Sequence, residues 1–586
     1  MRQLLIVLAL LPALLYGFQS SGKPLYISDI KVVEGNKLLI GTAGTREVGL
    51  MDFQGKIIRK WQFNEPVTGI AIDKNLAWIT SSDTFGLVTA INVNQPGKLS
   101  ETKVGMGARS PVLSTDKRSL YVAIQFERCV VKMDVQKSVI IGKIEVLREP
   151  FALCASPDGK YLFVNNFLPA QRADVDWVAA EVSVIDLNSL VRKDIKLSNG
   201  SNALRGICLS TDGKYLFITH NLGRYQVPTS QLEQGWMNTS GLSIIDVQKL
   251  EFLATVVLDE PEYGAAGSWD VQCAGNKMLV THSGTHDISV IDFNEFITKL
   301  LAEPNKKNLS YNLNFLTGIR QRFPLKGNGP RNFALNGNIA YIPAYFSDVL
   351  NVFDFSTGNL AEINLNPGRT ETNEDKGQRL FNDATFCFQG WQSCNGCHPG
   401  DARVDGLNWD LLNDGIGNPK NCKSLLFAHE TPPAMVSGIR GSADVAVRAG
   451  FKHIQFSEIS EENAKFVDAY LKALQPLPSP WLVNGALSKN AVKGKSIFER
   501  EGCAECHSGK YYTDLKSYKI GGEEKVLRDW KGWDTPTLRE VWRTAPYLFN
   551  GSAYQLNDVF EIHRHGLKSN LSKKEIDRLT EYVNSL

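Results

Sequence analysis

A five-residue pattern, C-x-x-C-H, occurs twice in the C-terminal part of the chain, as CNGCH at residues 394–398 and CAECH at residues 503–507. Two cysteines at this spacing can add across the two vinyl groups of one porphyrin, and the histidine that follows can ligate its iron. A bare C-x-x-C would leave zinc or disulfide sites open, whereas the adjacent histidine favours haem. The residues predicted to hold two covalent haem c groups are Cys394, Cys397 and His398 for the first and Cys503, Cys506 and His507 for the second.

The N-terminus predicts export. Met1-Arg2-Gln3 is followed by an apolar run over residues 4–16 and then by polar residues, which is typical of a secretory signal peptide. We assign residues 1–19 to this leader. The run is too short to favour a membrane anchor, so no membrane span is expected after its removal. Export agrees with haem c attachment, and the expected location is the periplasm, the extracellular space or the cell surface.

Charge and cofactor chemistry limit the partners. The net charge of +2 in 586 residues gives no case for nucleic acid. The partner predicted for a haem protein of this kind is a small redox protein or another electron donor or acceptor. Calcium is a further candidate cofactor, although no motif specifies it. Cys387 and Cys422 flank the first haem motif, and a disulfide between them is one alternative in an oxidising compartment.

Residues 24–365 read as short strands separated by turns, in a recurring unit. SPDGK at 156–160 leads into YLFVNN and then VSVID, and STDGK at 210–214 leads into YLFITH and then LSIID. Aspartate-glycine turns between alternating β-branched and aromatic residues predict hairpins. Repeats of about forty residues or more, each enough for a four-stranded sheet, predict propeller blades. We count seven blades. The pattern resembles the bacterial propeller family with Y-V-T-N and S-V-I-D repeats.

Two insertions in the propeller, at residues 168–179 and 223–240, leave from equivalent blade positions. Long loops on one face of a rigid scaffold often carry function. We expect this face to pack against the haem-binding half. The propeller histidines His220 and His282 occupy matching positions in adjacent blades, and hydrogen-bonded loop histidines are favoured over a joint metal site.

The remaining chain is helical and repeats itself once, which predicts two tandem, mainly α-helical cytochrome c domains at residues 370–475 and 483–586. Gly377 precedes the first haem motif and Gly494 precedes the second. Thr-Pro pairs follow the motifs at 431–432 and 535–536, and an amphipathic helix closes each copy. The fold class is therefore multidomain, an all-β seven-bladed propeller followed by two cytochrome c domains.

The segments DTPTLR at 534–539 and TAPYLFNG at 544–551 are similar to the C-terminal domain of bacterial di-haem cytochrome c peroxidases and of the related di-haem oxidases. In that family the segment after this motif supplies the distal iron ligand, a methionine or a tyrosine. The resemblance places His563 at that position. The first domain departs from the family pattern, because the tryptophan expected between the haems is absent, so peroxidase activity does not follow from the resemblance alone.

The distal ligands stay open. The second domain contains no methionine, so His563 is the favoured ligand of the second iron, with His565 next and Tyr547, Tyr554 or an open site as alternatives. For the first iron the candidates are His429, Met435, His453 or an open site. Trp391 and Trp409 are candidate electron carriers between the haems.

These residues predict a protein that transfers electrons. The first hypothesis is a peroxidase-like oxidoreductase in which the second haem passes electrons to a reactive first haem. The alternatives are an electron carrier that uses the propeller as a docking module, and a surface-binding propeller whose haems sense redox state. An open first iron favours the first hypothesis, and two six-coordinate irons favour the second.

Overall fold

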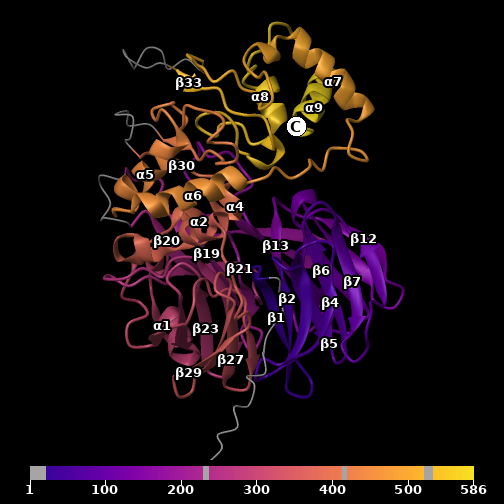
Figure 1. Cartoon of the computed structure of the whole chain (residues 1–586), viewed down its shortest axis with the longest axis vertical. Coiled ribbons are helices and arrows are strands. Elements are labelled where there is room, and N and C mark those ends of the chain that lie inside the picture. Colours follow the sequence, from indigo (N-terminus) through magenta and orange to yellow (C-terminus); the bar gives the residue numbers. More distant parts are fainter. Residues whose placement is uncertain (1–21, 229–235, 412–418, 521–531) are drawn as a thin grey trace, which may run out of the picture.

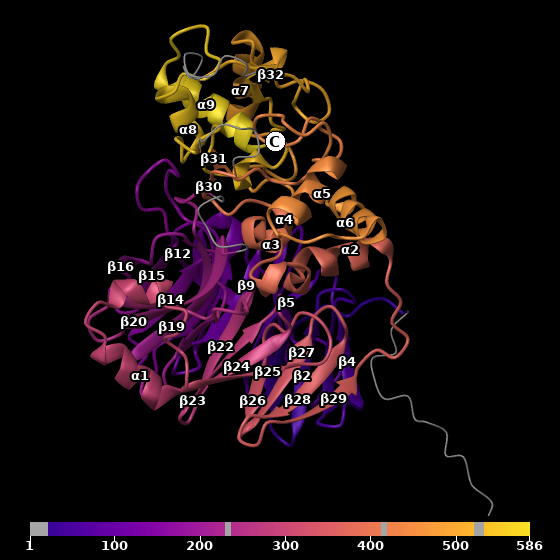
Figure 2. The same ribbon diagram turned by 90° about the vertical axis from the view of Figure 1, so that its left-hand side faces the viewer.

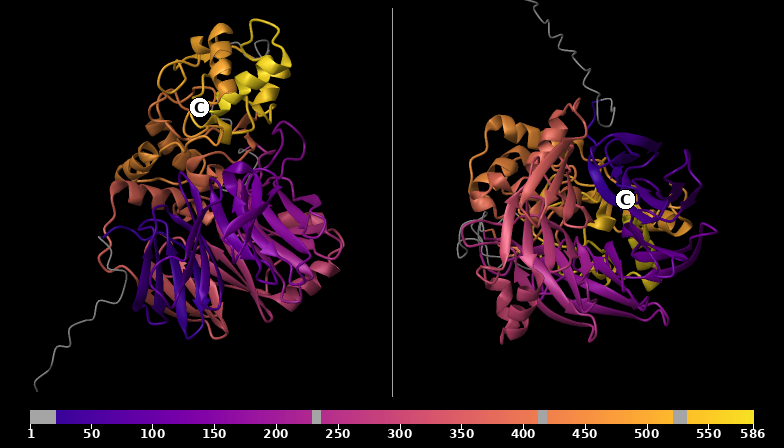
Figure 3. Two further views of the ribbon diagram at one scale, coloured as in Figure 1. Left: turned by 90° about the vertical axis from the view of Figure 1, so that its right-hand side faces the viewer. Right: turned by 90° about the horizontal axis from the view of Figure 1, so that it is seen from below.

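The computed structural model describes residues 22–228, 236–411, 419–520 and 532–586, and the predicted leader lies outside these ranges. Seven antiparallel sheets, each built from strands that follow one another in sequence, form the N-terminal part. They surround a central axis as the blades of a propeller, as the view from below shows (Figure 3). The two helical domains stand on one face of this disc, the first lying between the propeller and the second (Figures 1 and 2). The predicted architecture is confirmed.

Each blade runs from an inner strand to an outer strand, and the fifth blade has one additional short strand. The strands of the first three blades are β1 (Ile27–Val33), β2 (Lys37–Thr42), β3 (Glu47–Asp52), β4 (Ile57–Gln62), β5 (Val67–Asp73), β6 (Leu76–Ser82), β7 (Gly86–Asn92), β8 (Ser100–Lys103), β9 (Ala108–Leu113), β10 (Ser119–Ile124), β11 (Cys129–Asp134) and β12 (Val139–Glu145). Those of the last four are β13 (Pro150–Ala155), β14 (Tyr161–Asn166), β15 (Glu181–Asp186), β16 (Arg192–Lys196), β17 (Ser201–Asn202), β18 (Ile207–Leu209), β19 (Tyr215–Gly223), β20 (Asn238–Asp246), β21 (Glu251–Val257), β22 (Ser268–Ala274), β23 (Lys277–His282), β24 (Asp287–Asp292), β25 (Arg320–Pro324), β26 (Ala334–Asn336), β27 (Ile339–Ala344), β28 (Val349–Asp354) and β29 (Asn359–Asn364).

The Ser-x-Asp-Gly turn is repeated in the fourth and fifth blades and makes the same hydrogen bonds in both. Ser156 Oγ donates to Asp158 at 2.5 Å, and the backbone N–H groups of Lys160 and Tyr161 donate to Asp158 and Ser156. Gly159 has a φ of 71°, which glycine adopts without steric cost. The same contacts recur fifty-four residues later around Asp212. The side chains of Ser156 and Asp158 thus fix the position of the turn between strands β13 and β14.

The helical half begins after the last blade. Its helices and short strands, together with helix α1 of the propeller, are α1 (Phe293–Ala302), α2 (Asn373–Asn382), α3 (Cys394–Cys397), α4 (Pro399–Ala402), α5 (Ala443–His453), α6 (Glu461–Ala473), α7 (Lys489–Arg500), α8 (Leu556–Glu561), α9 (Lys573–Asn584), β30 (Asn408–Trp409), β31 (Lys420–Asn421), β32 (Ser517–Tyr518) and β33 (Trp533–Asp534). Within the described ranges, none of the helices combines the length and the apolar composition needed to cross a bilayer.

A glycine at the crossing of the first and last helix marks each helical domain. A Cβ atom on Gly377 would lie 1.9 Å from the carbonyl oxygen of Phe466, and one on Gly494 would lie 1.9 Å from that of Arg578. The nearest side-chain atom is the Cβ of Tyr470 or of Tyr582, at 2.8 Å in both cases. The α2–α6 and α7–α9 pairs therefore approach in the same way, which confirms the internal repeat.

The Thr-Pro register predicted for that repeat is wrong. Met435 and Leu548 both have left-handed backbone angles, with φ of 74° and 70°, and Gly438 and Gly551 follow at 62°. Thr431 and Thr544 each lie four residues before that left-handed residue. Residues 431–438 thus correspond to 544–551, and Thr535-Pro536 has no matching dipeptide in the first domain. A two-residue match was too short to fix the register.

The insertion-bearing face does pack against the haem half, as predicted. The backbone N–H of Ala173 donates to the carbonyl of Gly551 at 2.9 Å. Its own carbonyl accepts from Asn408 Nδ2 at 3.1 Å. Asn238, which ends the second insertion, donates to the Cys397 sulfur at 3.1 Å. The part of that insertion at 229–235 lies outside the described residues.

We expect alanine at Gly494 to destabilise the protein, because the added methyl group would overlap a backbone carbonyl that cannot move without separating α7 from α9. Overpacking of this kind costs about 1–3 kcal/mol or more in the free energy of unfolding. Thermal denaturation followed by helical circular dichroism measures it. Gly450→Ala is the matched control, since no atom lies within 4 Å of the added methyl group in helix α5. Equal stability of the two variants would contradict the close approach.

Candidate haem sites

The two proximal histidines have the same environment. His398 Nδ1 lies 3.1 Å from the carbonyl oxygen of Arg403, and His507 Nδ1 lies 3.1 Å from that of Tyr512. In each case the carbonyl comes five residues after the histidine, so the loop that follows the motif holds the ring. A carbonyl at Nδ1 fixes the proton there and leaves Nε2 free to bind iron.

Burial keeps both rings in the neutral form that binds a metal. It lowers the pKa of His398 to about 4, and it lowers the pKa of His507 below its ordinary value. The four cysteines of the motifs are free thiols in half-buried positions. Two free thiols and a neutral imidazole at this spacing are the donor set that covalent haem c requires. The residues present therefore fit the two haem groups.

The first motif rests directly on the propeller. Asn221 of β19 donates to the carbonyl of Gly396 at 3.1 Å, and Asn238 of β20 donates to the Cys397 sulfur. A Cβ atom on Gly396 would lie 3.2 Å from Asn238 Nδ2, so a side chain here would press against Asn238. On the other side Gln455 Nε2 donates to the Cys394 sulfur at 3.2 Å. The fifth blade thus forms part of the wall of the first haem site.

The alternative of a disulfide between Cys387 and Cys422 is wrong, because both thiols are free and they face different partners. Cys422 Sγ donates to the carbonyl of Cys397 at 3.1 Å and lies 3.5 Å from His398 Nδ1. Cys387 is buried beside the backbone of Trp391 and Gln392. Cys422 therefore belongs to the proximal side of the first haem site.

A second histidine faces His507 across the second site, and it is His565. The centroids of the two rings are 6.3 Å apart. An imidazole nitrogen binds a transition metal at about 2 Å, so two imidazoles on opposite sides of one iron hold their centroids roughly 6 Å apart. His563 is exposed, and its Nε2 lies 3.3 Å from the carbonyl of Ser552. The geometry therefore favours His565 over His563 as the distal residue.

The first domain has a serine where the second has His565. The backbone N–H of His565 donates to the carbonyl six residues earlier at 3.0 Å, and that of Ser457 does the same at 3.1 Å. The residue before each of them has a left-handed backbone, with φ of 49° at Arg564 and 50° at Phe456. Ser457 Oγ is buried and has no hydrogen-bond partner among the described residues. A serine at this position cannot replace the second imidazole.

The other distal candidates of the first site lie as follows. His429 Nε2 is 3.2 Å from Asp468 and 3.5 Å from Asp444, so carboxylates of α5 and α6 occupy that nitrogen. His453 is exposed at the end of α5. Met435 is half-buried in the left-handed turn that matches Leu548. The structure thus places His429 against two carboxylates and leaves Met435 as a candidate distal ligand.

The three groups His429, Asp444 and Asp468 lie close enough to hold a cation. Arg448 Nη1, however, donates to Asp468 Oδ2 at 2.6 Å and already supplies positive charge to this cluster.

The two tyrosines that were candidate ligands of the second iron have other contacts. Tyr547 donates its hydroxyl to the carbonyl of Val541 at 3.1 Å, and Tyr554 lies under the guanidinium of Arg128.

The tryptophans proposed as electron carriers lie near the first motif. Trp409 packs in a cluster with Cys397 and Cys422 and donates from Nε1 to Asp405 at 2.7 Å. Trp391 donates to Gln389 at 3.1 Å. An aromatic pair that sequence reasoning missed, Phe427 and Tyr511, joins the two domains with ring centroids 4.9 Å apart. No local motif identifies such a pair, because its members meet only when the domains pack.

A buried ion pair also joins the two haem domains. Arg403 donates from Nε and Nη2 to both carboxylate oxygens of Glu540, at 3.1 and 2.8 Å. Their side chains are 4% and 1% exposed, so this bidentate pair is removed from solvent. Since the Arg403 carbonyl accepts from His398, one residue holds the first proximal ligand and also binds the second domain.

Comparison with protein-family models gave no match. Among known proteins, the chain is similar to the hydrazine synthase subunit gamma of Kuenenia stuttgartiensis, at 28% identity over 270 residues, covering 36% of this chain and 76% of that protein. It is also similar to the subunit beta of the same enzyme, at 26% identity over 209 residues, covering 34% of this chain. The chain spans about half the length of that beta subunit, 51%.

The cytochrome c551 peroxidase of Nitrosomonas europaea is 22% identical over 262 residues, covering 36% of this chain and 78% of that protein. Among solved structures, a chain of Kuenenia stuttgartiensis hydrazine synthase superposes with a TM-score of 0.50 at 19% identity, covering 61% of this chain and 99% of that one. The structural likeness concerns the fold. The curated relatives support a haem-based redox function, and their cytochrome character agrees with haem c at the two C-x-x-C-H motifs.

Replacement of Arg403 by methionine should destabilise the packing of the two haem domains, because Glu540 would keep its charge inside the protein without its main partner. Breaking a buried pair from one side costs about 3–5 kcal/mol. Thermal unfolding of the haem protein, followed by haem absorbance, measures the loss. Lys573→Met removes an exposed ion pair with Glu561 and should leave the unfolding temperature unchanged. Equal unfolding temperatures would contradict a structural role of the buried pair.

Proposed function

We propose that this protein is an exported, peroxidase-like di-haem oxidoreductase, in which the second haem relays electrons and the first haem is the reactive site. One observation carries this assignment: His565 faces His507, whereas the residue with the equivalent backbone position in the first domain is Ser457. His507 and His565 together would hold a haem iron from both sides, which suits electron transfer, whereas His398 alone would leave a coordination position for a small oxidant or substrate. When bound, the haem would supply the redox-active metal, and the residue at position 457 or 565 would determine whether a second protein ligand is available.

The residues of this chain then have separate tasks. The carbonyls of Arg403 and Tyr512 orient the proximal rings, and burial keeps those rings neutral. Ser457 offers a hydroxyl without a partner among the described residues, so it can hydrogen-bond a small molecule at the open side. Phe427 and Tyr511 provide an aromatic contact across the domain boundary. A small redox protein in the same compartment is the proposed electron donor.

The relatives support this proposal at the level of chemistry. Two of them are cytochrome c peroxidases and two are subunits of hydrazine synthase, all named for redox enzymes. The leader predicted at residues 1–19 and the maturation of haem c outside the cytoplasm support export.

A second candidate function, an electron carrier, depends on Met435. This residue lies in the turn that matches Leu548, which packs against the core of the second domain. If its thioether bound the first iron, both sites would be closed and the protein would only carry electrons. Met435→Leu distinguishes the two. A sulfur-to-iron charge-transfer band that disappears in this variant would support the carrier and oppose the reactive first site.

We expect His565→Ala to convert one haem from six- to five-coordinate in the optical and paramagnetic-resonance spectra of the oxidised protein. His563→Ala is the matched control, because its exposed ring lies two residues away, and its spectra should match those of the unchanged protein. A spectral change in His563→Ala and none in His565→Ala would contradict the assignment of the second site.

Introducing a histidine at the open site tests the first haem. Ser457→His should reproduce the arrangement of His565, so cyanide binding to the first haem and reaction with peroxide should both fall by about tenfold or more. A cyanide titration followed by absorbance measures this. Unchanged cyanide binding together with an unchanged spectrum would show that residue 457 does not face the iron.

A further inference from the structure

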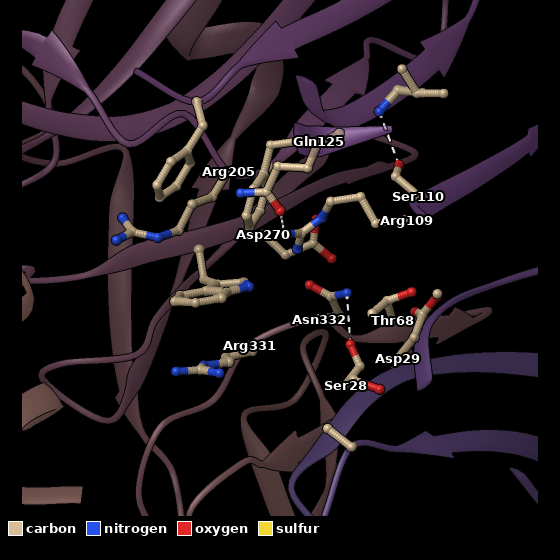
Figure 4. A pocket seen from close by; sticks show the side chains of 18 of the residues that line it. Ser28, Asp29, Thr68, Arg109, Ser110, Gln125, Arg205, Asp270, Arg331 and Asn332 are labelled. Atoms are coloured by element: carbon tan, nitrogen blue, oxygen red, sulfur yellow. Dashed lines mark hydrogen bonds between the residues drawn. The ribbon is translucent and has the colours of Figure 1, made fainter. Parts of the chain in front are cut away.

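A cavity of about 920 Å³ lies on the propeller axis, beneath the first haem domain. The propeller supplies most of its wall, and the roof includes Asn395 of the first haem motif and Gly400–Ala402, the loop after His398. The cavity extends along the axis to Lys117 in the β9–β10 turn, which is exposed. It therefore has a route to solvent at the end away from the haem domains. Figure 4 shows this cavity and the side chains on its wall.

Arginine and aromatic side chains alternate around the haem-facing end of the cavity. Arg109, Phe151, Arg205, Trp269 and Arg331 come from five successive blades, each at or just before the inner strand. Arg109 stacks on the Phe151 ring at 3.3 Å. Arg205 and Arg331 lie 4.8 and 4.0 Å from the centre of the Trp269 ring. Figure 4 shows the three arginines around the same space.

This stacking leaves the arginine donors available. A guanidinium that lies on an aromatic face keeps its five N–H groups in the plane of the group, away from that face. Two of the arginines donate to neutral partners: Arg109 donates to Gln125 at 2.9 Å, and Arg205 donates to Asn221 at 3.1 Å. Arg331 Nε is buried and has no hydrogen-bond partner among the described residues.

The positive charge of the cluster is not neutralised by ion pairs. In the described part of the chain, no carboxylate forms a salt bridge with Arg109, Arg205 or Arg331. Arg205 is buried, and Arg109 and Arg331 are half-buried on the cavity wall. Burial lowers the pKa of Arg109 and of Arg205 to about 9, and repulsion by Arg331 adds to the effect at Arg205. Buried charges are normally paired, so the cluster lacks an anion.

Glu149 acts on Arg109, and Asp401, on the roof, acts on both Arg109 and Arg331. The charge of Asp401 raises the pKa of Arg109 and of Arg331 against the effect of burial. Asp401 lies in a left-handed turn with Gly400 and Ala402, at φ of 63°, 63° and 61°. Glu149 is shared with Arg148 and Arg543, at 3.8 and 3.9 Å, and Asp29 and Asp270, which also line the cavity, interact with Lys31. The three arginines therefore keep an excess of positive charge.

We propose that this arginine cluster binds a small oxyanion, an inorganic oxyanion or a short carboxylate, between the propeller and the loop that follows His398. Guanidinium groups bind such anions through paired N–H donors in one plane. The propionates of a haem bound at the first motif would point away from this site, because thioether bonds form at the vinyl edge of a porphyrin and the propionates extend from the opposite edge. Asn395, between the two thioether cysteines, lines the cavity.

Calorimetric titration of the full-length haem protein tests the proposal, with sulfate in one arm and acetate in the other, and with chloride keeping the ionic strength constant. We expect saturable binding of one anion per chain in at least one arm. Arg205→Gln and Arg331→Gln should each weaken that binding about tenfold or more. Arg224→Gln is the matched control, because Arg224 is also buried and stacked, on Trp236 and Tyr311, but lies outside the cavity.

A variant that keeps every arginine makes the test independent of folding defects. Asp401→Asn removes the competing charge and keeps a residue type that tolerates the left-handed turn, so it should tighten binding about fivefold. The haem spectrum is recorded in the same titration, which separates this site from the iron. The proposal is overturned if no saturable binding occurs, if Asp401→Asn and the arginine variants leave binding unchanged, or if binding is accompanied by a haem spectral change that persists in Arg331→Gln.

Discussion

Glu540 is the point at which the three parts of the molecule meet. Its carboxylate accepts both donors of Arg403 from the first haem domain and lies 3.4 Å from Arg543. It also accepts the backbone N–H of Leu477 in the linker, at 3.3 Å. Arg543 continues the network to the propeller, because its guanidinium lies 3.9 Å from Glu149. Charges buried to this extent are stable only when all their partners are present, which makes the relative position of the domains specific.

The consequence of this network is that the two haem sites cannot be treated as separate domains on a flexible linker. Arg148 of the propeller donates to the carbonyl of Arg543 at 2.8 Å, so the blade also holds the backbone of the second domain. Phe126 and Trp542 meet edge to face at 5.6 Å in the same region. The aromatic contact between Phe427 and Tyr511 depends on this rigid arrangement, since it lies at the boundary that Arg403 and Glu540 close.

The sequence predicted the parts of this structure that local chemistry determines. The C-x-x-C-H motifs gave the proximal histidines, and the Asp-Gly turns gave the blades, because each signal lies within a few residues. The distal ligand of the second iron was harder to predict from the sequence. His563 and His565 differ by two positions, and the choice depends on the turn at Arg564, whose φ of 49° sets which side chain faces His507. Secondary-structure propensity cannot show which of two histidines in the same turn points toward the iron.

Contacts between distant segments could not be predicted at all. The three arginines of the cluster, Arg109, Arg205 and Arg331, are 96 and 126 residues apart in sequence, and each arginine alone looks like an ordinary surface residue. Ser457 was missed for a different reason: its role is defined by comparison with His565, and the helix before it is longer than its counterpart, which shifts the numbering between the domains. No sequence motif marks Ser457, because its importance lies in the absence of a histidine at that position.

The backbone at Gly400–Ala402 connects these observations. Three successive left-handed residues are costly for a chain of L-amino acids, about 1–2 kcal/mol at an alanine such as Ala402. Strain of this kind persists only where the surroundings determine the conformation, and it is common at functional sites. Here the turn carries the chain from His398 to Arg403 while placing Asp401 over the arginine cluster. The same strained turn thus holds the proximal ligand, reaches the second domain and closes the propeller cavity, which explains why the propeller and the haem domains belong to one rigid unit.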